Sequence, residues 1–186
     1  PGVPGEVEFE RRGVWTCADC DGPMYQNETA IVVGGGDSAF QEALVLAQYC
    51  SRVLLVHRGD RFRASHHFVA QVKANEKITP VLNATVEAIV GGKMVEKARI
   101  KHADGRVEDV PCAGVFAYIG LTPNADFLPT AVERDDAGLI RTDDAFQTTL
   151  PGVYAIGAVR SGYGGTLDHA LDEAQRAAAA IRAALT

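Results

Sequence analysis

Short, wholly apolar segments alternate with a helical pattern in the first third of the chain. Thr29–Val33 is rich in β-branched residues and ends at three glycines, and Val53–Val56 is a second run of this kind. Both are typical of strands covered on both faces of a sheet. From Ser38 to Tyr49, apolar residues recur at three- and four-residue spacing, which predicts a helix. Strand, glycine turn, helix and strand form a βαβ unit, so we expect the two strands to be parallel.

A different pattern follows this unit. After a helix expected near residues 65–76, short β-rich segments run from Val81 to Ile119, and a tight-turn pair, Asp104-Gly105, lies among them. These segments predict a small antiparallel meander. The predicted fold class is therefore α/β, with a β-meander insert.

Both ends of the chain carry local signals as well. Residues 1–12 hold Pro and Gly turn signals and alternating charges, which predict an extended connector. Near the other end, a short strand is expected at Val153–Ile156 and an Ala-rich helix at about 167–185.

Composition narrows the class of protein. The 186 residues include 18 Lys and Arg against 24 Asp and Glu, a net charge of −6 without a basic cluster. We therefore expect no nucleic-acid partner and no anionic membrane partner. No apolar run approaches the ~18–20 residues that span a bilayer, and no signal-peptide pattern opens the chain. The expected location is the cytoplasm.

The cysteines are few, but two of them are closely spaced. Cys17 and Cys20 form a C-x-x-C motif, whereas Cys50 and Cys112 stand alone. In a reducing compartment such a pair is usually redox-active or half of a metal site. Zinc would need two further ligands at matching spacing, and the remaining Cys and His residues are scattered, so no metal is expected. Inert buried thiols are the other alternative. Asp21 is the candidate for moving protons to and from a dithiol, or else a turn or cap residue.

A glycine motif stands between the first predicted strand and the helix. Gly34-Gly-Gly-Asp-Ser-Ala39 fits G-x-G-x-x-A. One glycine makes the tight turn, Gly36 lets a diphosphate approach the backbone, and the small Ala39 permits close packing of helix on strand. The diphosphate then rests on N–H groups at the beginning of the helix. Glycine turns without a ligand are common, but this strand–helix context favours dinucleotide binding.

The end of the second strand indicates which dinucleotide binds. An NAD site would place an acidic residue about 20 positions after the glycines. Here the chain reads His57-Arg58-Gly-Asp-Arg-Phe-Arg63. Cations at this place would neutralise a 2′-phosphate through charge-assisted hydrogen bonds, which predicts NADP(H). A solvated basic loop is the alternative. Nicotinamide delivers two electrons as hydride, so transfer to a disulfide calls for a flavin between them.

Five motifs in this order resemble the low-molecular-weight thioredoxin reductases, within the FAD-dependent pyridine nucleotide–disulfide oxidoreductases. They are W-T-C-A-D-C-D-G, G-G-G-D-S-A, H-R-x-x-x-F-R, Ile119-Gly-x-x-Pro-Asn124 and Pro151-Gly-Val-Tyr-Ala-Ile-Gly157. The resemblance covers essentially the whole chain. Ferredoxin- and flavodoxin-type reductases of similar architecture are disfavoured because they lack the C-x-x-C.

The resemblance implies an FAD domain interrupted by an NADPH domain that carries the disulfide. Residues 1–12 would be the crossover linker and 13–118 a Rossmann-like three-layer NADPH domain with the meander. Residues 119–186 would be the C-terminal part of the split FAD domain. Cys17 would attack the substrate's disulfide, Cys20 would face the flavin and Asp21 would be the acid. The NADPH and FAD contacts implied for this chain are Gly34, Gly35, Gly36, Asp37, Ser38, Ala39, Glu42, His57, Arg58, Arg63, Ile119, Gly120, Gly157, Ala158, Val159, Thr166 and Leu167.

The chain departs from the family pattern in four places, and these departures leave two functional hypotheses open. The chain starts after the family's first FAD-binding unit, and the family's FAD-contacting Asp is Ala158. The family's Arg-Gln-Ala beside the flavin is Gly165-Thr-Leu167, and the second Arg of H-R-R is Gly59. The first hypothesis passes electrons from NADPH through FAD and the dithiol to a thioredoxin-like or other disulfide substrate. The alternative is a catalytically silent NADP(H)-binding fragment or subunit that needs a separate FAD-binding half. Uncovered apolar faces after residue 120 predict a homodimer.

Overall fold

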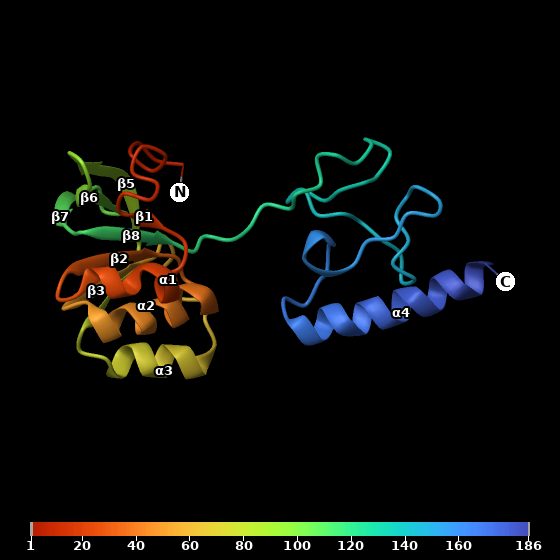
Figure 1. Ribbon diagram of the computed structural model, residues 1–186, viewed down its shortest axis with the longest axis horizontal. Helices are drawn as coiled ribbons and strands as arrows, with labels where there is room; N and C mark the ends of the chain where they lie inside the picture. The colour runs from red at the N-terminus through yellow and green to blue at the C-terminus, as the bar shows by residue number, and fades with distance from the viewer. Residues whose placement is uncertain (1, 186) are drawn as a thin grey trace. The chain divides into compact units, whose positions relative to one another are not determined.

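The chain forms two compact units, and each is described by itself. The computed structural model describes residues 2–185. The first unit runs to Ile119 and the second begins at Gly120 (Figure 1). Among the described residues, no helix is both long and apolar enough to cross a membrane.

A five-stranded parallel sheet is the centre of the first unit. Its strand order is β1-β8-β2-β3-β4, and every neighbouring pair is parallel. The βαβ unit expected from the sequence is therefore confirmed. The strands are β1 (Val14–Trp15), β2 (Thr29–Val33), β3 (Arg52–Val56), β4 (Ile78–Val81) and β8 (Gly114–Ala117).

Helices cover one face of this sheet. Alternate strand residues such as Ala30 and Val32 pack there against Phe40 and Leu46 of α2. All of these side chains are almost fully buried, so the contact is part of the core. The helical segments are α1 (Ala18–Asp21), the 3-10 turn η1 (Gly22–Tyr25), α2 (Asp37–Tyr49) and α3 (His66–Ala74).

An antiparallel sheet covers the other face and completes three layers. Its order is β5-β6-β7, and Figure 1 shows it on the side of the parallel sheet away from α2 and α3. The intervening strand residues Ile31 and Leu54 point to this side and pack with Val86 and Ile100. Two-sided burial explains why the central residues of β2 and β3 are apolar. The three strands are β5 (Ala84–Gly91), β6 (Val95–His102) and β7 (Val107–Pro111).

Two local expectations for the first unit need correction. The meander is shorter than 81–119, because Gly114–Ala117 pairs in the parallel sheet as β8. Residues 2–12 are mostly turns and not an extended connector. Phe9 is only 2% exposed, and the N–H of Ile89 donates to the carbonyl of Pro4, so this segment packs on the antiparallel sheet. Turn residues alone did not reveal that a buried aromatic side chain would fold the segment back.

The second unit contains little regular structure. It has isolated β-bridges, a 3-10 turn η2 (Gly157–Val159) and the helix α4 (Leu167–Leu185), which confirms the expected Ala-rich helix. The prediction of a strand at Val153–Ile156 is wrong. Within these residues the structure has a single isolated bridge, from Tyr154 to Gln147. An apolar run forms a strand only where a neighbouring strand completes its ladder. The core of this unit is small and consists of Ala125, Val132, Ile140 and Ala155.

Candidate redox and nucleotide site

A disulfide joins Cys17 and Cys20 at the beginning of α1. Their Cα atoms are 5.4 Å apart, and Cys17 is the N-cap of the helix. The backbone N–H of Cys20 donates to Sγ of Cys17 over 3.2 Å. Cys20 is exposed, while Cys17 and Asp21 are half-buried. The structure thus places the three expected redox residues together, with the disulfide accessible from outside the unit.

The glycine turn lies between β2 and α2, and its three glycines have different surroundings. Gly34 has φ +154°, and a Cβ there would lie 2.4 Å from the carbonyl oxygen of Tyr118. A Cβ on Gly35 would lie 2.3 Å from Nδ1 of His57. By contrast, a Cβ on Gly36 would meet no heavy atom within 4 Å. Packing therefore accounts for Gly34 and Gly35, whereas the space beside Gly36 is open to a ligand at the beginning of α2.

The basic loop is attached directly to this turn. The N–H of Arg63 donates to the carbonyl of Gly35 over 2.7 Å, and the N–H of Ser65 donates to Oδ1 of Asp37 over 2.6 Å. Arg58 and Arg63 are both exposed. The loop therefore presents its cations beside the turn, where a 2′-phosphate would need them.

His57 is the buried member of the basic segment. It lies directly after β3, with its ring next to Gly35 and 5.5 Å, centroid to centroid, from Phe62. Burial lowers its pKa, and the positive charge of Arg63 lowers it further. A neutral, buried ring suits a packing role against the turn. The exposed arginines of the loop, Arg58, Arg61 and Arg63, are then the cations available to an anionic ligand.

Glu42 bridges the disulfide helix and the end of β8, a position that the sequence did not reveal. Its Oε2 accepts the N–H of Ala18 over 2.7 Å and the hydroxyl of Tyr118 over 3.0 Å. Ala18 belongs to the disulfide helix, and Glu42 belongs to the helix that begins at the glycine turn. The sequence singled out Glu42 as a cofactor contact and did not single out Tyr118. Their contact joins residues 76 positions apart, which no local pattern reveals.

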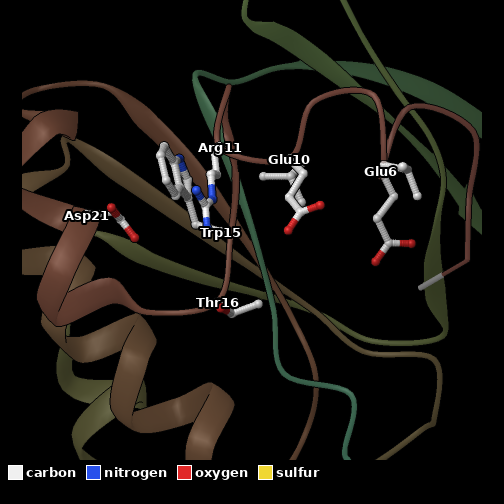
Figure 2. A pocket seen from close by; sticks show the side chains of 8 residues that line it. Glu6, Glu10, Arg11, Trp15, Thr16 and Asp21 are labelled. Carbon is white, nitrogen blue, oxygen red and sulfur yellow. The ribbon is translucent and has the colours of Figure 1, made fainter.

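A pocket of about 470 Å³ is lined by the N-terminal segment, by β1 and by the last residue of the disulfide helix. Figure 2 shows carboxylates of the N-terminal segment, Glu6 and Glu10, and Asp21 from α1. Trp15 also lines it, and the indole N–H of Trp15 donates to the hydroxyl of Tyr25. Within residues 2–185, no group of three or more His, Cys, Asp or Glu side chains could hold a metal ion.

The remaining candidates lie at the unit boundary and in the second unit. Ile119 and Gly120 flank the division between the units and are exposed. Ala158, Thr166 and Leu167 are exposed as well.

Buried charges shape the turn η2. Gly157 has φ +70°, and its N–H donates to Oε2 of Glu173 over 2.7 Å. Arg160 also donates to Glu173, and this bond lowers the pKa of the carboxyl against the opposing effect of burial. Val159, the last residue of η2, packs on the small core of the unit. The carboxylate of Glu173 thus holds the turn that carries Ala158.

This arrangement defines the class of protein: a dinucleotide-type glycine turn and an accessible disulfide on one α/β unit. The sequence profile of the family described as "Pyridine nucleotide-disulphide oxidoreductase" matches residues 1–181. The chain therefore belongs to the pyridine nucleotide-disulphide oxidoreductase family.

Thioredoxin reductases are among its similar proteins. The chain is 40% identical over 161 residues to one from Treponema pallidum (strain Nichols), covering 86% of this chain and 52% of the relative. It is 43% identical over 162 residues to one from Listeria monocytogenes, covering 86% and 51%. The crystal structure of Lactococcus lactis thioredoxin reductase (FR conformation) has a TM-score of 0.91 at 36% identity, covering 97% of this chain and 61% of that one. The chain thus spans about half the length of the two sequence relatives.

Proposed function

We propose that this chain is the NADPH-binding and dithiol-bearing part of a thioredoxin-reductase-like oxidoreductase. Electrons would pass from NADPH through FAD to the Cys17–Cys20 disulfide, and then to a thioredoxin-like protein or another disulfide substrate. The observation that carries the proposal is the hydrogen bond from Ala18 to Glu42, 2.7 Å long. It links the disulfide helix to the helix that begins at the glycine turn, so both functional elements share one rigid support.

The nucleotide half rests on the open space beside Gly36 and on two arginines. The diphosphate of NADPH would lie against the first N–H groups of α2, from Asp37 to Ala39, where backbone donors point outward. Arg58 and Arg63 would hold the 2′-phosphate, because the bond from Arg63 to Gly35 keeps the loop beside the turn. Glu42 and His57 stay proposed members of this site.

The dithiol half rests on the N-cap position of Cys17. When the pair is reduced, the N–H of Cys20 is placed to stabilise a thiolate on Cys17. That thiolate would attack one sulfur of the substrate disulfide, forming a mixed disulfide and releasing the other sulfur as a thiolate. Cys20 would then attack Sγ of Cys17, which restores the Cys17–Cys20 bond and frees the second substrate thiolate. Asp21 would supply protons to the departing sulfurs.

The flavin half is proposed for the second unit. Bound FAD converts hydride into the electron pair that opens a disulfide. A Cβ on Gly157 would meet no heavy atom within 4 Å, so the backbone of η2 can approach a flat ligand. Gly120, Val159, Thr166 and Leu167 would complete the contacts from this unit.

One observation favours the alternative, a catalytically silent NADP(H)-binding fragment or subunit. The N–H of Gly157 is already bonded to Glu173, and Ala158 offers no carboxylate to FAD. A separate FAD-binding half would then be needed. The absorption spectrum of the purified, dialysed chain decides between the two: a flavin band supports the first, and a colourless chain that binds NADPH supports the second.

The nucleotide assignment is tested by titrating NADPH and NADH against three variants of the full chain. Arg58→Ala and Arg63→Ala should each weaken NADPH binding at least tenfold, since a charge-assisted hydrogen bond contributes about 1.5–3 kcal/mol. NADH binding should change little. Arg52→Ala, which removes an exposed cation at the opposite end of β3, is the matched control. Equal losses of NADPH and NADH would contradict the assignment.

A further inference from the structure

The carboxylate of Glu42 lies where three parts of the first unit meet. It comes from α2, it accepts the N–H of Ala18 in α1 over 2.7 Å, and it accepts the hydroxyl of Tyr118 over 3.0 Å. Both bonds end on the same oxygen, Oε2. Ala18 follows Cys17 and is fully buried, so the bond acts on the backbone between the two cysteines.

We propose that Glu42 is a positioning residue for the Cys17–Cys20 pair and that it lowers the reduction potential of this pair. The inference rests on the proposed redox function of these two cysteines. Glu42 would hold the Cys17–Ala18 backbone in the same place whether the pair is oxidised or reduced. The two sulfurs of the dithiol then stay within reach of each other, which favours the disulfide.

The disulfide helix needs such an external support. α1 has only four residues, Ala18–Asp21, and a single turn of helix is unstable by itself. In the oxidised state the covalent bond holds the Cα atoms 5.4 Å apart. After reduction, two backbone bonds of the turn remain, from the N–H of Asp21 to the carbonyl of Cys17 over 3.1 Å and from the N–H of Gly22 to the carbonyl of Ala18. The bonds from Cys20 to Cys17 and from Ala18 to Glu42 add to them, and only the last ties the turn to another helix. Without the carboxylate, the buried N–H of Ala18 would keep only the nearby hydroxyl of Tyr118 as an acceptor, and opening of the turn relieves the cost of the lost bond.

Tyr118 fixes the carboxylate itself. Its backbone N–H donates to the carbonyl of Val33 over 2.8 Å, so it is anchored on the parallel sheet directly after β8. Burial raises the pKa of Tyr118, and the bond to Glu42 raises it further. The hydroxyl therefore remains a proton donor across the neutral range, and Glu42 has a second, rigid point of attachment.

Four variants test whether the length of the Glu42 side chain or its negative charge is responsible for the effect. Glu42→Ala removes the acceptor, and Glu42→Asp keeps the charge but shortens the side chain by one methylene, so that the carboxylate no longer reaches Ala18. Glu42→Gln keeps the length and an acceptor oxygen without the charge. Glu76→Ala removes an exposed carboxylate of the same unit and is the matched control. Circular dichroism shows whether each variant is folded.

The full-length chain is equilibrated without oxygen at graded ratios of oxidised to reduced dithiothreitol. In this exchange the two thiols of dithiothreitol form a disulfide and transfer two electrons and two protons, while the Cys17–Cys20 bond opens to two thiols. Alkylation under native conditions and mass spectrometry then count accessible thiols. Cys50 and Cys112 are buried, and burial raises the pKa of Cys50 to about 11 and that of Cys112 to about 12, so native alkylation should report mainly on Cys17 and Cys20.

Glu42→Ala and Glu42→Asp should each shift the equilibrium about tenfold toward the dithiol, which is about 30 mV for a two-electron couple. Glu42→Gln should stay within about threefold of the parent, and Glu76→Ala should match it. A folded Glu42→Asp variant with the parent's equilibrium would overturn the inference, as would a Gln variant shifted as far as Ala. If the parent pair cannot be reduced and reoxidised at any ratio, the proposed redox function fails instead.

Discussion

The two units of the chain differ in how completely their own residues cover their apolar surface. In the first, both faces of the parallel sheet are buried, one under helices and one under the antiparallel sheet. In the second, among the residues that the structure describes, α4 buries only Glu173 and Ala177. Leu167 and Leu185 of that helix are 74% and 82% exposed.

This difference shows that a helix can be predicted correctly from the sequence while its apolar side chains remain exposed in the structure. α2 and α4 were both predicted from local pattern, and both form. However, α2 lies on a sheet that the same unit supplies. Residues 120–185 form no sheet beneath α4, only isolated bridges and a small cluster around Ile140. We therefore expect the first unit to be the more stable of the two and the second to depend more on its polar contacts.

The largest expected effect is loss of packing at the centre of the first unit. Phe116 on β8 is fully buried and packs edge-on against Tyr25. Phe116→Ala should reduce the free energy of unfolding by about 4 kcal/mol, because it removes a large side chain and leaves a cavity. Urea unfolding followed by fluorescence of Trp15, the single tryptophan of the chain, measures this unit alone. Phe127→Ala, at a position 79% exposed in the second unit, should leave that midpoint unchanged.

The second unit should respond most to its buried ion pair. Glu173→Ala leaves the guanidinium of Arg160 without its carboxylate and the N–H of Gly157 without its acceptor. Breaking one partner out of a buried pair costs about 3 kcal/mol. Hydrogen exchange of amides after residue 120, read by mass spectrometry, should accelerate strongly, while exchange in β2 and β3 stays slow. Equal protection in parent and variant would mean that this pair does not hold the unit together.

The same pair gives the second unit an acid dependence. The pKa of Glu173 lies below its ordinary value of 4.5, chiefly because Arg160 donates to the carboxylate. A lowered folded-state pKa means that this stabilisation is complete above pH 4.5 and is lost as the pH falls through the folded value. After correction for the intrinsic exchange rate, which itself falls with pH, the protection of amides in the second unit should therefore decrease below about pH 4.5. In Glu173→Gln, which does not titrate, that part of the pH profile should be flat.

Two adjacent glycines give a smaller and more selective effect in the first unit. Gly35→Ala should destabilise it by about 1–3 kcal/mol, because the new Cβ overlaps His57 in a packed site. Gly36→Ala meets no protein atom, so stability should stay within about 0.5 kcal/mol of the parent. If Gly36 faces NADPH as proposed, the same change should weaken NADPH binding. Unchanged binding by Gly36→Ala would contradict that contact.

The smallest expected effect on stability concerns the exposed side of α4. Leu171 is 54% exposed, and Leu171→Ser should change the free energy of unfolding by no more than about 0.5 kcal/mol. The homodimer remains a prediction, and the effect of this substitution on self-association tests it more directly than its effect on stability. If a second copy covers this side, the doubly changed Leu167→Ser, Leu171→Ser chain should sediment as a smaller species than the parent. Identical monomers would argue against the predicted dimer.

Local pattern predicted the elements that stand next to one another along the chain. The βαβ unit was predictable because Thr29–Val33 and Val53–Val56 are short apolar runs separated by one helix and one glycine turn. The disulfide between Cys17 and Cys20 joins residues three positions apart. The expected strand at Val153–Ile156 failed because strands depend on partners, and its hydrophobicity says nothing about which segment lies beside it.

The amino-acid sequence alone determined the glycine turn, the C-x-x-C pair and the cations after the second strand, since each depends on a few neighbouring residues. Tertiary structure alone decided the bond from Ala18 to Glu42, the hydroxyl of Tyr118 on the same oxygen, and the folding of Phe9 onto the antiparallel sheet. Such contacts join segments that are distant in the chain. Their geometry follows from how the layers pack, and no spacing along the sequence encodes it.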